Sequence, residues 1–170
     1  GIGIDVYAGV NCLFSDLFIN GKDTGINFRS NTVNGHKTDG VDIKGCVITW
    51  CNTGVTAIGS AIRLTNGYID QILNYTMTVT DAINCIFDGM WFGGHGENIV
   101  IYSSSQLKFT NCVITGGDTP NTWSVNGSLS CNHIYFINCT LHSIFCDICC
   151  RVVFHIRNKP FVRCSVETIQ

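Results

Sequence analysis

The chain has 170 residues, of which 45% are apolar and 13% are charged, and its formal net charge at pH 7 is −2. This length allows one domain with a real core, and the composition excludes a disordered tail and leaves no basic patch for nucleic acid. No apolar run reaches the roughly 20 residues of a membrane-spanning helix, so no membrane insertion is expected. Good helix formers are scarce and Asp, Asn, Gly and Thr abound, which predicts an all-β protein with tight turns.

A short motif, Asn or Gly followed by Cys, recurs along the chain, and the steps from Cys85 to Cys112 and from Cys112 to Cys139 are both 27 residues. Apolar residues alternate with period two on either side and break at the Asn or Gly, which tolerate the left-handed backbone of a bend. A strand, a bend, a second strand and a turn at this interval predict a parallel β-solenoid of about six coils. The cysteines of the motif are then reduced core residues: Cys12, Cys46, Cys85, Cys112 and Cys139.

The motif is spaced more widely in the first half of the chain. The steps from Cys12 to Cys46 and from Cys46 to Cys85 are 34 and 39 residues, which predicts protruding loops over residues 20–38 and 66–76. An antiparallel β-sandwich is the alternative architecture, but it gives no reason for a repeated Asn-Cys at constant spacing. The chain starts with Gly1 rather than Met, so we expect a fragment or a processed product.

The repeat fades near its C-terminal end. We therefore expect the solenoid over residues 1–145 and an irregular cap or subunit-contact segment over residues 146–170. Five potential zinc ligands gather there, without the two-pair spacing of a zinc ribbon: Cys146, Cys149, Cys150, His155 and Cys164. We expect them to have a core or capping role, with no metal and no cofactor.

The repeat pattern over residues 1–145, with Asn at its bends, resembles the right-handed parallel β-helix superfamily of pectate lyases, polygalacturonases and phage tailspikes. The segment T-D-G-V-D-I at 38–43 resembles the N-T-D motif region of polygalacturonases, with Lys37 in place of the Asn. The segment G-H-G at 94–96 resembles their G-H-G motif. The paired aspartates expected between these motifs are absent from residues 54–58, a departure that tailspikes, whose carboxylates vary in position, tolerate better.

The resemblance implies a right-handed, single-stranded parallel β-helix of a homotrimeric tailspike in a virion tail, which recognises and depolymerises a bacterial surface polysaccharide. Glycosidic hydrolysis would use one carboxylic acid to protonate the leaving oxygen and a second carboxylate to activate water. The alternatives are a non-catalytic structural or adhesive tail β-helix and a secreted pectinase-like hydrolase or lyase. A lyase would need a base such as His95 and a cation from a short set: Arg29, Lys37, Lys44 or Arg63.

The candidate catalytic residues are four acids and one histidine: Asp39, Asp42, Asp88, Glu97 and His95. Asp88 is expected to share an outward column with Thr49, Thr115 and His142, because each stands three residues after a cysteine of the repeat. The alternative for each acid is an ordinary turn or a solvated strand residue.

The segment 91–97 is the strongest candidate site. Trp91 stands close to Gly93, Gly94, His95 and Glu97, and an exposed indole offers a surface on which the apolar face of a pyranose can pack. An ordinary connecting turn is the alternative. The further candidate substrate-binding residues are Trp50, Trp123 and His142.

Overall fold

The computed structural model describes residues 1–7, 9–29, 38–95, 97–115, 124–128, 131–146, 152–156 and 161–164. In these ranges every regular element is a β-strand and every strand pairing is parallel. The described ranges contain no helix that could cross a membrane. The all-β, parallel expectation is therefore confirmed, and the antiparallel sandwich is wrong.

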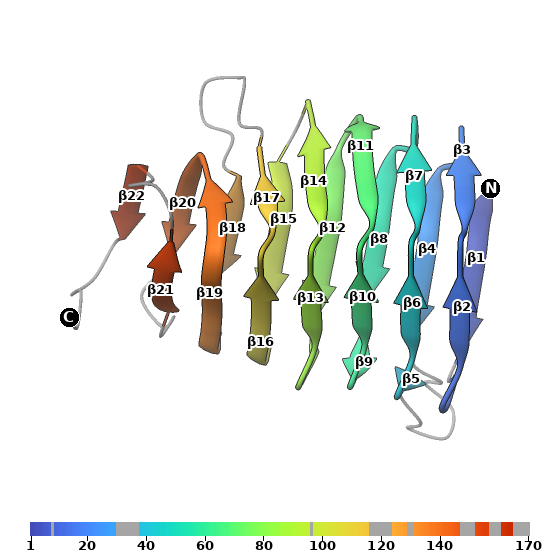
Figure 1. Cartoon of the computed structure of the whole chain (residues 1–170), viewed down its shortest axis with the longest axis horizontal. Coiled ribbons are helices and arrows are strands. Elements are labelled where there is room, and N and C mark those ends of the chain that lie inside the picture. The colour runs from blue at the N-terminus through green and yellow to red at the C-terminus, as the bar shows by residue number, and fades with distance from the viewer. Residues whose placement is uncertain are drawn as a thin grey trace.

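The strands form three long ladders, which we call sheets A, B and C (Figure 1). Sheet A has the order β1 (Ile2–Tyr7), β4 (Thr24–Arg29), β8 (Thr53–Ala57), β12 (Tyr75–Thr80), β15 (Glu97–Tyr102), β18 (Val125–Ser128), β20 (Ser143–Cys146) and β22 (Phe161–Cys164). Sheet B has β2 (Leu13–Ser15), β6 (Asp42–Lys44), β10 (Arg63–Thr65), β13 (Ile86–Asp88), β16 (Ser105–Thr110), β19 (Asn132–Leu141) and β21 (Val152–Ile156). Sheet C has β3 (Phe18–Asn20), β7 (Val47–Thr49), β11 (Tyr68–Ile72), β14 (Trp91–Gly94) and β17 (Val113–Ile114), and it joins sheet B through β19. A small pair, β5 (Thr38–Asp39) and β9 (Gly59–Ser60), lies apart from these paths.

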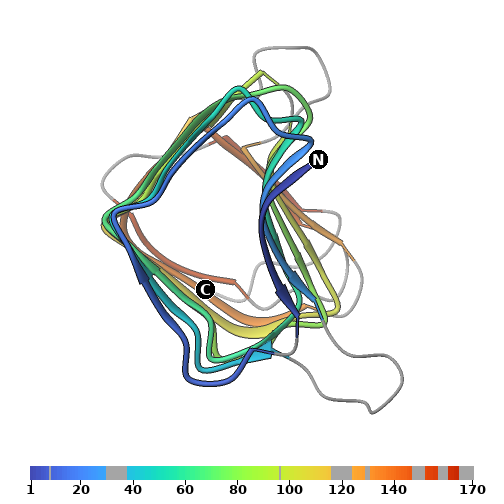
Figure 2. The ribbon, with the colours of Figure 1, turned by 90° about the vertical axis from the view of Figure 1, so that its right-hand side faces the viewer.

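Viewed along the direction in which the strands stack, the three sheets surround one interior (Figure 2). The chain visits sheets A, B and C in turn and then returns to sheet A one strand further on. Strands β21 and β22, within residues 146–170, continue the parallel pairing on β19 and β20. This arrangement is compatible with a parallel β-solenoid.

Left-handed backbone marks two corners in each repeat of the chain. One such residue, the first corner, lies at or near the start of the sheet B segment. A second, the second corner, follows five residues later, so the backbone changes direction at the same two points in each described repeat. The predicted bends at the Asn-Cys and Gly-Cys motifs are confirmed. The pairs are Asn11 and Asp16, Gly40 and Gly45, Ala61 and Asn66, Asn84 and Gly89, Gln106 and Asn111, and His133 and Asn138.

The predicted 27-residue repeat is wrong in part, because the Asn-Cys motif occurs at both corners. Cys85 follows a first-corner residue, whereas Cys112 follows a second-corner residue. Their 27-residue step is one repeat of 22 residues plus the five that separate the corners, and first-corner residues are 21 to 29 residues apart. The loop predicted over 66–76 is also wrong, since β11 and the start of β12 occupy it. Within the other predicted loop, 20–38, β4 belongs to sheet A, and residues 30–37 lie outside the described ranges.

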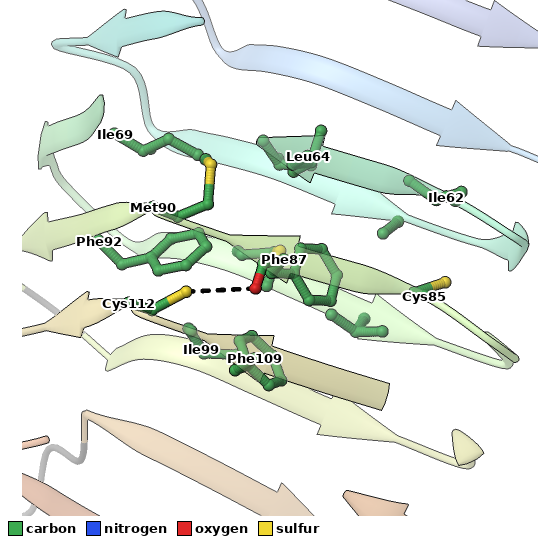
Figure 3. Packing of buried hydrophobic residues seen from close by; sticks show 14 of the residues in the cluster. Ile62, Leu64, Ile69, Cys85, Phe87, Met90, Phe92, Ile99, Phe109 and Cys112 are labelled. Atoms are coloured by element: carbon green, nitrogen blue, oxygen red, sulfur yellow. Dashed lines mark hydrogen bonds between the residues drawn. The ribbon is translucent and has the colours of Figure 1, made fainter. Parts of the chain in front are cut away.

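The inward positions of sheet B form a column of large apolar side chains (Figure 3). Phe87 stacks on Phe109 with ring centroids 4.7 Å apart, and Phe109 stacks on Phe136 at 4.8 Å. Phe92, from sheet C, meets Phe109 edge to face at 6.4 Å. Aromatic pairs at these separations add to the hydrophobic gain of burial, so this stack is a central part of the core.

The cysteines of the repeat lie in the core as predicted. Cys46, Cys85, Cys112 and Cys139 are buried free thiols, and Cys12 is a half-buried free thiol. The Sγ of Cys112 donates to the carbonyl of Phe87 at 3.4 Å (Figure 3). These small side chains fill the corners without a polar group that needs a strong partner.

Two of these thiols give the protein a predicted pH dependence. Burial raises the pKa of Cys46 and of Cys85 from 9.0 to about 11. Because the native thiols keep their protons longer than the unfolded ones, their stabilising contribution is complete below pH 9 and is lost as the pH rises towards 11. We expect the free energy of unfolding, measured with urea, to fall over this interval, and to fall less steeply for Cys85→Ala.

The control for that series is Ser60→Ala, which removes no group that titrates in this pH range. Its slope against pH should match that of the unaltered chain. Equal slopes in Cys85→Ala and in the unaltered chain would show that this thiol does not contribute.

Candidate functional site

The outward side of sheet C carries exposed aromatic side chains in one column. Strand register aligns Tyr68 with Trp91 across β11 and β14, and Phe18 occupies the same column on β3. Phe18, Tyr68 and Trp91 are 72%, 41% and 38% exposed, and the Tyr68 and Trp91 rings are near-parallel with centroids 6.0 Å apart. Figure 1 shows β3, β7, β11 and β14 following one another along the molecule. We call this column the aromatic strip: Phe18, Val47, Tyr68, Trp91, Val113 and Thr140.

A carboxylate stands beside the two central rings of the aromatic strip. Asp70 lies two residues after Tyr68, on the same outward side of β11, and is half-buried. The Tyr68 hydroxyl donates to Asp70 Oδ2 at 2.5 Å, and the Gln71 backbone N–H donates to Asp70 Oδ1 at 2.8 Å. The hydrogen bond to Asp70 raises the pKa of the Tyr68 hydroxyl. Both donors hold the carboxylate in one orientation next to the rings.

A β-bulge after Asp70 brings the end of β14 into the same cluster. The register between β11 and β14 shifts between Ile69 and Ile72, and Gln71 has a left-handed φ of 56°. The Oε1 of Gln71 lies 3.3 Å from His95 Nε2, so the amide and the imidazole form one polar group. Bulges redirect side chains in this way and are frequent at functional sites.

Gly93 is a buried residue of β14 whose missing β-carbon leaves room for the side chains of Asp70 and Trp91. A β-carbon at Gly93 would collide with Asp70 Oδ1 and would lie 3.0 Å from Trp91 Nε1. The carboxylate and the indole N–H therefore both occupy the space that a β-carbon would need here. A small residue is required here so that polar and aromatic groups can approach one another.

Trp50 lies at the edge of the same face, at the corner that leads towards sheet A. It is 59% exposed and has a left-handed φ of 56°, which is uncommon for a bulky residue. Gly21 and Gln71 have left-handed backbone at the equivalent corner of the neighbouring repeats. Of the tryptophans predicted to bind substrate, the structure places Trp50 and Trp91 near sheet C, while Trp123 lies outside the described residues.

The candidate acids Asp39, Asp42 and Asp88 lie on the sheet B side of the molecule. Asp39 Oδ1 accepts from Ser60 Oγ at 2.9 Å, and Asp42 Oδ2 lies 3.7 Å from Lys44 Nζ. Asp88 and Asp42 are two strands apart and in different columns, so their Cα atoms are separated by about 11 Å or more. The polar partners of these three acids are Ser60, Lys44 and Asn111, and neither His95 nor Trp91 is among them.

The predicted column of Thr49, Asp88, Thr115 and His142 is wrong for Asp88, whereas Thr49, Thr115 and His142 all belong to or directly follow strands of sheet C. Asp88 pairs in register with Thr65 and Thr110 on sheet B, where Asn111 Nδ2 donates to it at 3.0 Å. Thr49 belongs to sheet C, because Cys46 and Cys85 mark different corners. Exposed His142 directly follows Leu141, which continues sheet C. Glu97 begins β15 in register with Tyr75, and its side chain lies outside the described part of the structure.

A metal centre is not formed by the described side chains, among which no three His, Cys, Asp or Glu residues gather. In the C-terminal cluster, Cys146 and Cys164 are register partners in sheet A, whereas His155 pairs with Ile137 in sheet B. Cys149 and Cys150 lie outside the described residues.

Sequence reasoning found Trp91 and His95 but missed Tyr68, Asp70 and Gln71. A signal was available in the segment that begins at Tyr68, because Tyr and Asp alternate there with buried Ile69 as in an outward-facing strand. The long spacing between Cys46 and Cys85 instead led to the prediction that this segment is a loop. Comparison of the chain with protein-family models, with curated proteins and with solved structures finds no match.

Proposed function

We propose that this chain is a right-handed, single-stranded parallel β-helix that recognises a polysaccharide along the aromatic strip. Parallel register in all three sheets and two left-handed corners in each repeat support the β-helix. Strands spaced by about 4.8 Å make the strip roughly 24 Å long over its six positions. A surface of this length accommodates several consecutive sugar residues.

The observation that carries the proposal is the cluster around Tyr68 and Trp91. The two exposed rings offer apolar surface for sugar C–H groups. Asp70 and the pair of Gln71 and His95 place acceptors and donors beside those rings. Apolar surface with a few polar groups in fixed positions is typical of sites that bind small polar ligands.

The geometry supports recognition better than cleavage by paired carboxylates. Hydrolysis of that type needs two carboxyl groups within about 5 to 10 Å. Asp70 is the one carboxylate in the described strands of sheet C, and Asp42 and Asp88 belong to sheet B. Depolymerisation with Glu97 as an acid stays a prediction.

The biological setting of the proposal comes from the sequence resemblance to phage tailspikes. It comprises a homotrimer in a virion tail, and a bacterial surface polysaccharide as the ligand. Light scattering coupled to size-exclusion chromatography tests the trimer. A monomeric full-length parent protein would favour the secreted, pectinase-like alternative.

A panel of bacterial capsular and O-antigen polysaccharides tests the function. The full-length parent protein, in its native oligomer, is run through gels that contain each polymer, and binding is read as retardation. The same mixtures are assayed for new reducing ends and for the ultraviolet absorbance of an unsaturated uronate. Retardation without either product supports recognition alone, reducing ends support hydrolysis, and both products support a lyase. Absence of retardation by every polymer would contradict the proposed function.

A further inference from the structure

The charge on the aromatic strip is set by one side chain. Asp70 is the only charged residue in β3, β7, β11, β14 and β17. The Lys and Arg residues of the described strands lie on the other two sheets: Arg29 and Arg163 are on sheet A, whereas Lys44, Arg63 and Lys108 are on sheet B. Lys22 follows β3, two strands from β11, a separation of about 10 Å that is comparable to the screening length at physiological salt. Among the described residues, a ligand on the central rings therefore meets the negative charge of Asp70, and the titratable base in the same cluster is the imidazole of His95.

The carboxylate of Asp70 is also fixed in place. Tyr68 and the Gln71 backbone donate one hydrogen bond to each of its oxygens. Because Gly93 has no β-carbon, Oδ1 and the Trp91 indole N–H both lie against this residue. A carboxylate in this position can accept a hydrogen bond from a sugar hydroxyl, but a second carboxylate placed beside it would be repelled.

We infer that the aromatic strip selects polysaccharides whose sugars carry no carboxylate or sulfate, so that uronic-acid and sulfated polymers are excluded. This inference rests on the proposed function and assigns its ligand class. A uronate-binding site would require cations that pair with the sugar carboxylates. The described strands of sheet C offer an anion instead.

The test compares each acidic polymer of the panel with its carboxyl-reduced form, so that the chain of sugars stays the same and only the charge changes. We expect the native protein to bind neutral polymers, and to bind the reduced form of an acidic polymer at least about tenfold more tightly than its acidic form. Asp70→Asn should remove most of that difference, because the amide retains the size but not the charge. Asp81→Asn is the matched control, since Asp81 is exposed on the turn after β12 and its left-handed φ of 49° suits Asn.

The outcomes separate the inference from the function on which it rests. Preference for an acidic polymer over its reduced form would overturn the inference while the proposed function stands. A preference for reduced forms that persists unchanged in Asp70→Asn would also overturn it, because the selection would then come from another group. Absence of binding to every polymer in both forms would refute the function and the inference together.

Discussion

Replacement of Phe109 by Ala is expected to lower the free energy of unfolding by about 3 to 5 kcal/mol. Phe109 lies between Phe87 and Phe136 at 4.7 and 4.8 Å and also meets Phe92, so its removal leaves a cavity lined on several sides by aromatic rings. Because neighbouring backbone is fixed in parallel ladders, the walls cannot collapse far into that cavity. Urea unfolding followed by circular dichroism measures the loss.

Lys108→Ala is the control on the same strand. Lys108 faces solvent next to buried Phe109, and substitutions at such positions change stability by about 0.5 kcal/mol or less. Phe109→Leu should fall between the two variants, since Leu refills part of the volume. A loss below about 1 kcal/mol in Phe109→Ala would contradict the packing described for this column.

Trp91→Ala is expected to weaken polysaccharide binding by about 30-fold, which corresponds to about 2 kcal/mol. The indole supplies apolar contact area, packs near-parallel to Tyr68 and lies against the buried Gly93. Its loss removes both a sugar-facing surface and the support of the neighbouring ring. Isothermal titration calorimetry with the tightest polymer of the panel measures the change.

Tyr102→Ala provides a matched control for that substitution. Tyr102 is 40% exposed, close to the 38% of Trp91, but it lies on sheet A. Its replacement should leave affinity unchanged, and unfolding curves of both variants establish that each remains folded. Similar affinity for Trp91→Ala and for the unaltered chain would place the ligand on another face.

The repeat made the class of fold predictable from the sequence. The alignment of one repeat with the next could not be predicted in the same way. Alternation of apolar residues around Cys46 and Cys112 correctly placed strands, bends and buried thiols. The predicted alignment of the repeats was wrong because Asn-Cys fits either corner. At both corners a left-handed residue precedes a small inward-facing one. Cys85 and Cys112 were therefore aligned although they occupy different corners. Only the strand pairing distinguishes the two corners.

The candidate site was predictable only at Trp91 and His95. Trp91 and His95 stand in an unusual glycine-rich segment and attract attention in the sequence itself. Asp70 lies beside them because β11 pairs with β14 and because the chain bulges at Gln71. Neither the pairing nor the bulge can be recognised from the local amino-acid composition. Asp39 and Asp42 drew attention through a short motif, but motif similarity carries no information about which sheet a side chain faces.

The two left-handed corners have a consequence for how such a surface can change over time. Each position of the aromatic strip follows its first corner by seven residues, from Phe18 after Asn11 to Thr140 after His133, although the repeats differ in length. All variation in length is thus confined to the return path through sheet A. Insertions can accumulate there while every strip position stays aligned with its neighbours. Single substitutions in the strip can then change which side chains are presented without moving the backbone that carries them.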